Sequence, residues 1–468
     1  MVPAVGVIAV VLAGCAISHL LAPRLSILER VASGYCIGLA SVTFLLFVFS
    51  WAGVPLSQGL CIGIPIILAA GAYIVRRCTG KNRFPGAGRA KIVFTPRGSA
   101  GTLEFLLLGG IVILVGIAAV QALYWPVFEF DAIHLYDQRA KLVYEQRGIA
   151  LDEYHALLFW RYVDYPLHVS LSHSYIYLLA GRSDINPQLI YVGYYAALLA
   201  VFYCRARRTM TMRNALLSTL VIASAPPIFR HASWCTTTFP YLCYYSIGVI
   251  YLCEFMRGED KGLLYIGALF MAFTSWIRPG NELVVLGVAV VLGYDCARKR
   301  RWAPVCILLA AAGAVYAAWT TYLHTIHRYA SLATFHFSGY DKLFVPGNVL
   351  YVLKSCIADH TLSVPYAGLI WYIFLLASVK GFVAGRGQRE IPAIIISTLG
   401  VLTALFYLLG LQCDFADFWR FQAWNASSRL MPMLIPMAVY YSALVLLGDE
   451  RCHGRVSAPK TPHPPCAG

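Results

Sequence analysis

Long apolar runs that contain no Asp, Glu, Lys or Arg recur along most of this chain. A helix needs about 20 predominantly apolar residues to cross a bilayer, and many of the runs reach that length. Only 13% of the 468 residues are charged, whereas soluble domains are about a quarter charged. The pattern therefore predicts an all-α, polytopic transmembrane helical bundle and excludes soluble globular and disordered chains. The runs are Met1–Pro23, Val31–Val75 (two spans), Phe105–Phe128, Ile185–Cys204, Asn214–Phe229, His231–Cys253, Gly262–Ile277, Leu283–Tyr294, Trp302–His327, Thr361–Val379, Ile391–Cys413 and Leu430–Leu447.

The net charge of +15 comes from basic residues that gather in the short links between these runs. Such links are typical of cytoplasmic loops under the positive-inside rule. No separate basic domain exists, so the charge does not predict nucleic-acid binding. The links that we expect to be cytoplasmic are 76–97, 205–213, 298–301 and 380–389, together with the tail from Arg451.

This orientation leaves three longer segments outside the membrane, at 129–166, 328–360 and 414–429. The apolar stretch Leu167–Gly181 is too short to span. If it forms a helix that dips into the membrane or lies at its interface, every basic link stays on the cytoplasmic side. The count becomes about 13 spans. We expect a single transmembrane domain over 1–448 and a disordered, proline-rich cytoplasmic tail over 449–468.

The first outer segment begins with two carboxylates close to the end of an apolar run. Glu129 and Asp131 emerge within a few residues of that run, in a stretch rich in Trp, Phe and Tyr. Burial near hydrocarbon raises the proton affinity of a carboxylate, which suits a general base. The aromatic residues favour short interfacial helices in this segment. A solvated acidic rim without chemistry is the alternative interpretation.

Several short motifs in this layout resemble those of bacterial integral-membrane glycosyltransferases of the GT-C fold, which use polyprenyl-phosphate-linked sugars. The matching motifs are Phe130-Asp131-Ala132, Arg139-Ala140-Lys141, Tyr165-Pro166-Leu167, Ser428-Arg429-Leu430-Met431-Pro432 and, more loosely, Ser275 to Glu282. Leu167 stands where the family commonly has a second proline. Thr236, Thr237 and Thr238 stand where many relatives carry an Asp, so we expect no bound metal.

The resemblance implies a mechanism and assigns roles to residues. A carboxylate takes the proton of an acceptor hydroxyl, which attacks the anomeric carbon of a sugar carried on a polyprenyl phosphate. Asp131 is the expected base and Glu129 the alternate. Arginine matches phosphate geometry, so Arg429, Arg278 and Arg161 are the expected phosphate contacts. Where the segment returns to the membrane, Asp164, Tyr165 and His168 are expected to orient the acceptor.

These roles predict a bacterial plasma-membrane enzyme with its active site facing outward. Its partners would be a lipid-linked sugar donor, a glycan or lipid acceptor, and membrane lipids. Two other classes remain open. A polysaccharide polymerase or ligase is favoured by the His-rich segment 328–360, with His336 and His360. A transporter or flippase predicts charged residues in mid-helix, whereas the charges here lie mostly at the ends of the apolar runs.

Overall fold

The computed structural model is helical throughout the part of the chain that it describes. Eight of its helices are long and apolar enough to cross a membrane: Ala4–Leu21, Ile27–Trp51, Gln58–Cys78, Thr102–Tyr124, Leu189–Thr209, Thr238–Gly258, Ala303–Thr325 and Trp424–Leu447. The number of spans beyond these eight is not fixed by length and composition, because several other apolar helices are shorter than a full span. The structure describes residues 2–79, 101–152, 163–183, 186–258, 260–326, 346–383, 389–411 and 424–448.

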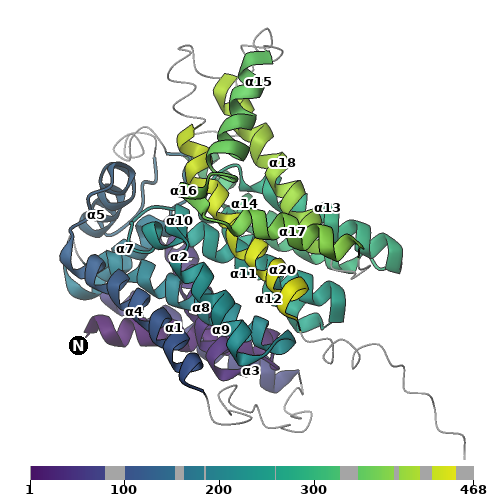
Figure 1. The fold of residues 1–468 in the computed structure, drawn as a ribbon. Coiled ribbons are helices and arrows are strands. Elements are labelled where there is room, and N and C mark those ends of the chain that lie inside the picture. The colour runs from purple at the N-terminus through teal and green to yellow at the C-terminus, as the bar shows by residue number, and fades with distance from the viewer. Residues whose placement is uncertain are drawn as a thin grey trace, which may run out of the picture.

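The first half of the chain forms one side of the bundle (Figure 1). Helix α2 starts where Ser26 caps it by accepting a hydrogen bond from the Glu29 amide, and Ser57 caps α3 in the same way. The elements are α1 (Val2–Leu21), α2 (Ile27–Trp51), α3 (Gln58–Cys78), α4 (Thr102–Tyr124), the π-helix η1 (Ala132–Asp137), α5 (Gln138–Gln146), α7 (His168–Ala180), the 3₁₀ turn η2 (Asn186–Gln188), α8 (Leu189–Thr209), α9 (Met212–Ser224) and α10 (Pro226–His231).

The second half packs against the first along α11 and α20 (Figure 1). Its elements are α11 (Thr238–Gly258), α12 (Lys261–Ser275), α13 (Asn281–Lys299), α14 (Ala303–Thr325), α15 (Pro346–Leu353), the π-helix η4 (Lys354–Asp359), α16 (Val364–Ala367), α17 (Ile370–Val383), α18 (Glu390–Leu411), the 3₁₀ turn η5 (Met431–Leu434) and α20 (Ile435–Leu447).

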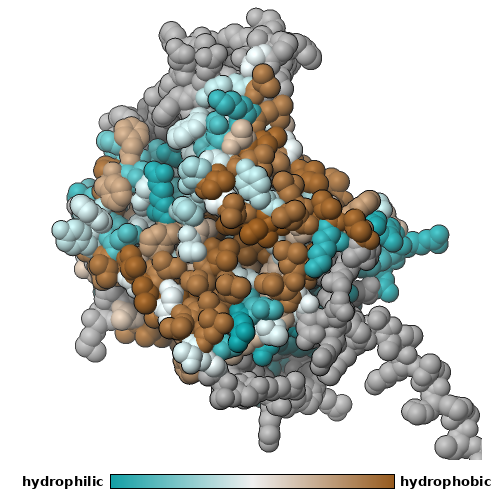
Figure 2. Space-filling view, in the orientation of Figure 1, coloured by the Kyte–Doolittle hydropathy of each residue, from teal (hydrophilic) through white to brown (hydrophobic). Residues whose placement is uncertain are grey.

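Helices at the centre and at the periphery of the bundle differ in what covers them. Almost every residue of α11 is buried by protein, and so is most of α8. Most of the apolar side chains of α3 and α4 are instead left uncovered. Hydrophobic residues occupy the middle of the face seen in Figure 2, and hydrophilic residues gather toward its ends. That banding is expected of a bundle whose outer helices contact lipid.

Two expectations about short segments need adjustment. The stretch Leu167–Gly181 forms α7, but twelve of its thirteen residues are buried, so it is an internal helix rather than one lying on the surface. The last span begins at Trp424 rather than at Leu430, which places Arg429 inside a helical segment. Helices also occupy part of the expected outer segment 328–360. The tail 449–468 lies outside the described residues.

Contacts between the segments that connect the helices show which of these segments lie at the same end of the bundle. At one end, Arg24 meets Asp260 at 3.5 Å, and the Asn214 amide donates to the carbonyl of Leu447 at 3.1 Å. We call this the Arg205 end, because Arg205 lies there near the end of α8. At the other end Trp319 donates to the carbonyl of Asp164 at 3.2 Å. We call this the Asp131 end.

Candidate functional site at the Asp131 end

An ion pair joins two residues that are 298 positions apart in the chain, Asp131 and Arg429. Asp131 directly precedes the π-helix η1, and Arg429 comes from the helical segment that leads into η5 and α20. Their side chains are 28% and 27% exposed, so the pair sits at a boundary between protein and surroundings. The two residues expected to be the base and the leading phosphate contact are therefore in direct contact.

Glu129 is two residues before Asp131 and shares an electrostatic environment with the pair and with Arg230. It is half-buried, and burial raises the pKa of its carboxyl above the ordinary value of 4.5. The positive charges of Arg230 and Arg429 lower that pKa, and the negative charge of Asp131 raises it. Glu129 therefore holds a proton more readily than an exposed glutamate does, while it remains within reach of two cations.

Arg230 ends the short helix α10 and is exposed. Its guanidinium lies over the Trp234 ring, 4.4 Å from the centroid, and Trp234 meets Phe128 edge-on with 6.2 Å between the ring centres. The next residue, His231, is only 6% exposed, and none of the described residues forms a hydrogen bond with its Nδ1. This corner therefore holds a cation and a buried polar atom that lacks a partner.

The buried Tyr136 and the half-buried Tyr165 line the same region and connect it to Arg278. Tyr136 and Tyr165 meet edge-to-face at 6.4 Å, and Tyr136 shares a 3.0 Å hydrogen bond with Thr237. Burial raises the pKa of both phenols, and the positive charge of Arg278 lowers both. Arg278 therefore lies close enough to both rings to share one electrostatic environment with them.

The turn that carries Arg278 is fixed by its neighbours. Trp276 is fully buried, and Gly280 adopts a left-handed φ of 76° that ends the turn before α13. The guanidinium of Arg278 is partly exposed, and within the described residues no side chain hydrogen-bonds or ion-pairs with it. A partly buried arginine that has no protein partner is suited to receive an anion.

A buried arginine, Arg139, holds the end of the first outer segment (129–166) against the bundle. Arg139, 1% exposed, donates to the carbonyl of Tyr165 at 3.1 Å. Burial raises the pKa of Asp164, and the charge of Arg139 partly offsets that rise. The structure thus places Tyr165 against the site, and it places Asp164 beside Arg139.

His168 is not brought into the site. It is fully buried at the start of α7, where its Nδ1 contacts the Thr43 hydroxyl and its Nε2 the Tyr194 hydroxyl, both at 2.8 Å. Both ring nitrogens are occupied inside the bundle, so we assign His168 a packing role and leave it out of the site. Arg161 lies outside the described residues.

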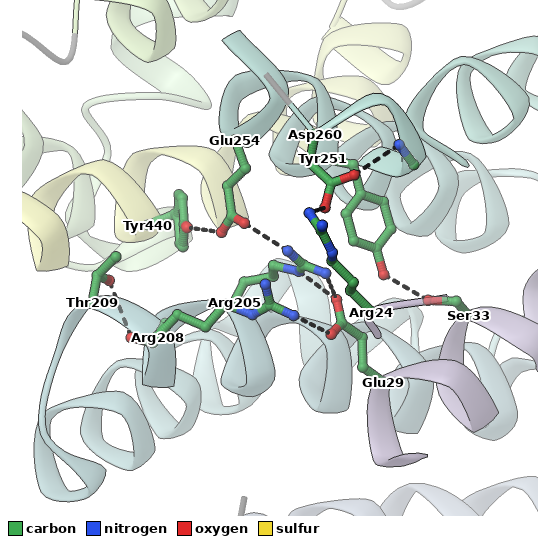
Figure 3. A network of polar contacts seen from close by, with 12 residues as sticks. Arg24, Glu29, Ser33, Arg205, Arg208, Thr209, Tyr251, Glu254, Asp260 and Tyr440 are labelled. Atoms are coloured by element: carbon green, nitrogen blue, oxygen red, sulfur yellow. Dashed lines mark hydrogen bonds and ion pairs between the residues drawn. The ribbon is translucent and has the colours of Figure 1, made fainter. Parts of the chain in front are cut away.

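A second polar cluster lies at the Arg205 end (Figure 3). Fully buried Arg205 ion-pairs with Glu29 and Glu254, and Tyr440 donates to Glu254 at 2.7 Å. Arg208 also reaches Glu29 at 3.3 Å. Every carboxylate in this cluster has a basic partner, and the contacts tie together α2, α8, α11 and α20. A charge-balanced, closed cluster of this kind is suited to hold helices together.

The Asp131 end differs from that cluster in its balance of charge. Asp131 is matched by Arg429. Among the residues that the structure describes, Arg278 forms no ion pair, and Arg230 acts on a glutamate whose pKa is raised. Across the described residues, no group of three or more His, Cys, Asp or Glu side chains is arranged to hold a metal ion. An excess of cations beside a proton-binding carboxylate can bind an anion and move a proton.

Sequence reasoning missed Arg230. A signal was present, because Arg230 separates two apolar runs on the side opposite the basic links. Arginines on that side depart from the positive-inside pattern and therefore need another explanation.

No protein-family model matches the chain, and a search of curated proteins finds no match. The candidate site therefore depends on the chemistry of its own residues.

Proposed function

We propose that the protein is a membrane glycosyltransferase that moves a sugar from a polyprenyl-phosphate donor to a glycan or lipid acceptor. The observation that carries this proposal is the Asp131–Arg429 pair, flanked by Glu129, Arg230 and Arg278. Transfer from a lipid phosphate requires a group that accepts a proton and cations that stabilise the departing phosphate. Both kinds of group meet at this end of the bundle.

The proposed reaction exchanges one bond for another. The acceptor oxygen forms a bond to the anomeric carbon, and the bond from that carbon to the phosphate oxygen breaks. The phosphate leaves with the bonding electrons, and the hydroxyl proton passes to Asp131, with Glu129 as the alternate acceptor. Arg278 and Arg230 stabilise the charge that develops on the phosphate. The ion pair with Arg429 holds the Asp131 carboxylate in position until the acceptor arrives.

We place the Asp131 end outside a bacterial plasma membrane and the Arg205 end in the cytoplasm, with about 13 spans in total. The basic links at Arg76, Arg205 and Arg298 support this orientation through the positive-inside rule. Five further helices, α9, α12, α13, α17 and α18, run between the two ends in alternation with the eight candidate spans, and this alternation supports the count.

The polymerase or ligase alternative depended on the histidines of 328–360. His360 is 2% exposed, and its Nδ1 lies 2.7 Å from the carbonyl of Ser355 and 2.9 Å from the Ser427 hydroxyl. Ser427 is two residues before Arg429, so His360 positions the arginine in our proposal rather than touching substrate. His336 lies outside the described residues.

Purified protein in lipid nanodiscs, given a radiolabelled polyprenyl-phosphate sugar and membrane extract as the acceptor source, tests the proposal. We expect transfer of label by the wild type, and a 10- to 100-fold higher KM for the donor in Arg278→Gln, because a bidentate phosphate contact is lost. Arg182→Gln is the matched control, since Arg182 forms an exposed ion pair with Glu145 away from the site. Equal donor KM values in the two variants would contradict the assignment of Arg278.

A further inference from the structure

Two partly buried basic residues, His19 and Arg30, lie at the Arg205 end of the bundle, where α1 ends and α2 begins. The two helices approach closely about one turn further into the bundle, where a Cβ on Gly14 would lie 1.8 Å from the Gly34 carbonyl oxygen. His19 follows Gly14 by five residues and Arg30 precedes Gly34 by four, so both lie just beyond this contact, on its outer side. The Cys15 thiol also donates to the carbonyl of Arg30 at 3.5 Å. The packing of α1 on α2 therefore brings the two basic residues to the same place.

A third basic residue, Arg76, joins them from the last turn of α3. Helix α1 packs against α3 as well as against α2. The charges of Arg30 and Arg76 both act on His19, and the charge of Arg76 also acts on Arg30. Like charges repel one another more strongly beside protein than in water, because protein screens them less. Three helices therefore meet at a site of positive potential that a bound anion would stabilise.

Two of these side chains carry buried nitrogen atoms to which no described residue hydrogen-bonds. The Nη2 of Arg30 donates to the carbonyls of Pro23 and Leu25, at 3.0 and 3.1 Å. The Nε of Arg30 and the Nδ1 of His19 are buried, and neither forms a hydrogen bond within the described part of the chain. An arginine that only anchors a helix extends its charge into water, whereas Arg30 is folded back against the link between α1 and α2. Because a buried polar group without a partner is costly, these two nitrogens favour a ligand that accepts hydrogen bonds.

The carboxylate next to this site is engaged elsewhere. Glu29 adjoins Arg30 in the chain, but one of its oxygens contacts Arg205 and the other lies 3.3 Å from Arg208 (Figure 3). The sequence from 77 to 103, which follows the third basic residue, contains no Asp or Glu. Within the described residues no carboxylate forms an ion pair with Arg30 or His19. We therefore expect the anion that balances this site to be a ligand.

We propose that His19, Arg30 and Arg76 bind the phosphate of an anionic phospholipid in the leaflet at the Arg205 end. Arginine forms charge-assisted hydrogen bonds with phosphate, and basic pockets between membrane helices suit lipid headgroups. In our proposed orientation this is the cytoplasmic leaflet. The site lies at the opposite end of the bundle from the candidate functional site, so the inference does not depend on sugar transfer.

Apolar side chains at the same helix ends favour a lipid over a free phosphate as the source of the anion. Ile27 in the first turn of α2 is 58% exposed, and Ile74, two residues before Arg76, is 57% exposed. Acyl chains can cover such side chains while the phosphate contacts the basic residues, whereas inorganic phosphate leaves them uncovered. The bound lipid would hold α1, α2 and α3 together by balancing the charges that these helices contribute.

Thermal unfolding of the full-length protein in dodecyl maltoside tests this site. Unfolding is followed with a dye that reacts with cysteines as they leave the buried core. The protein is titrated with phosphatidylglycerol, with phosphatidylcholine, which carries no net charge, or with inorganic phosphate. A ligand that binds only the folded protein raises the Tm. We expect phosphatidylglycerol to raise the Tm by about 3–5 °C, and the other two ligands to raise it by less than about 1 °C.

Two adjacent arginines of α3 provide a matched pair of variants. Arg76→Gln should weaken the apparent affinity for phosphatidylglycerol about tenfold, because a hydrogen bond to a charged phosphate is lost. Arg77→Gln removes the same charge from the same helix end and should leave the affinity unchanged, since Arg77 is exposed and its guanidinium lies 5.1 Å from the centre of the Tyr73 ring. Arg30→Gln should resemble Arg76→Gln. If Arg30→Gln does not fold, Arg76→Gln tests the site without removing the contacts between Arg30 and the link that precedes α2.

Three results would overturn the proposal. Equal Tm increases with phosphatidylglycerol and phosphatidylcholine would show that the headgroup charge is not recognised. Equal losses of affinity in Arg76→Gln and Arg77→Gln would show that lipid responds to the total surface charge rather than to this site. A Tm increase with inorganic phosphate as large as that with phosphatidylglycerol would assign the site to a soluble anion instead of a lipid.

Discussion

Replacing Asp131 by Asn tests whether this aspartate has a chemical role rather than a structural one. Asp137, in the same segment, serves for comparison, because it is expected to have a structural role only. Asp131 forms an ion pair whose two side chains are 28% and 27% exposed. Partly exposed pairs contribute up to about 1 kcal/mol to stability. Loss of a general base lowers the rate by about 10²- to 10⁴-fold. Asp131→Asn is therefore expected to fold normally and to transfer almost no sugar.

Asp137 lies six residues further on and is 3% exposed. Lys141 contacts its carboxylate at 2.7 Å and His173 at 3.5 Å, and Tyr177 also donates to it. Burial alone would raise its pKa, but these hydrogen bonds and charges hold the pKa at about 2. Removing one partner of a buried charged cluster costs about 3 kcal/mol or more. Asp137→Asn is therefore expected to lower stability and to keep the transfer rate of each folded molecule.

Two measurements on the same samples check this contrast. Heat unfolding in detergent can be followed with a thiol-reactive dye, since Cys36, Cys243 and Cys253 are buried in the folded protein. Initial rates of label transfer are then divided by the folded fraction. Full activity in Asp131→Asn would refute its assignment as the base. A loss of stability in Asp131→Asn equal to that in Asp137→Asn would show that the Asp131–Arg429 pair is structural.

Three further predictions concern pH, the Arg205 cluster and helix packing. Burial raises the pKa of Glu129 in the folded state above 4.5, so its stabilising contribution is full below pH 4.5 and is lost as the pH rises through the raised pKa. The Tm of the wild type should therefore fall relative to that of Glu129→Gln over this pH range. A Tm difference between the two proteins that does not change with pH would contradict this prediction. Glu29→Gln leaves buried Arg205 partly unpaired and should lower the free energy of unfolding by about 3–5 kcal/mol. Glu145→Gln, in an exposed ion pair, should lower it by less than about 1 kcal/mol. Equal losses of stability in the two variants would show that the Arg205 cluster does not hold the helices together. A Cβ on Gly14 would lie 1.8 Å from the Gly34 carbonyl oxygen, so Gly14→Ala should lower the Tm by forcing α1 away from α2. The control is Gly63→Ala, whose Cβ meets nothing within 4 Å, and it should leave the Tm unchanged or raise it. A similar change of Tm in the two variants would refute close packing of α1 on α2.

The all-helical class follows from sequence because hydrocarbon imposes a length and a polarity on each spanning helix. Backbone groups inside a bilayer must pair within their own segment, so charge-free runs of about 20 residues predict helices wherever they occur. The run Val31–Val75 was correctly divided into two helices, α2 and α3. Shorter segments escaped this reasoning. Helix α7 has thirteen residues, and only its neighbours reveal that protein rather than lipid surrounds it.

The candidate site was only partly accessible from sequence. A motif that resembled known enzymes led to Asp131 and Arg429, and the structure pairs them. The same reasoning chose His168 because the first outer segment returns to the membrane there, but its two hydrogen bonds to Thr43 and Tyr194 direct it into the core. It overlooked Arg230, whose proximity to Glu129 depends on how α10 lies against the first segment.

Composition and hydropathy alone predicted a bundle of apolar helices long enough to cross a membrane, because the solvent acts on each segment separately. Only the tertiary structure decided which polar residues meet, since residues 298 positions apart become neighbours through helix packing that no local pattern encodes. It also decided which charges are balanced, as around Arg205, and which have no ion-pair partner within the described part of the chain, as at Arg278. That difference depends on distances between helices, and it separates a cluster that holds helices together from one that can receive an anion.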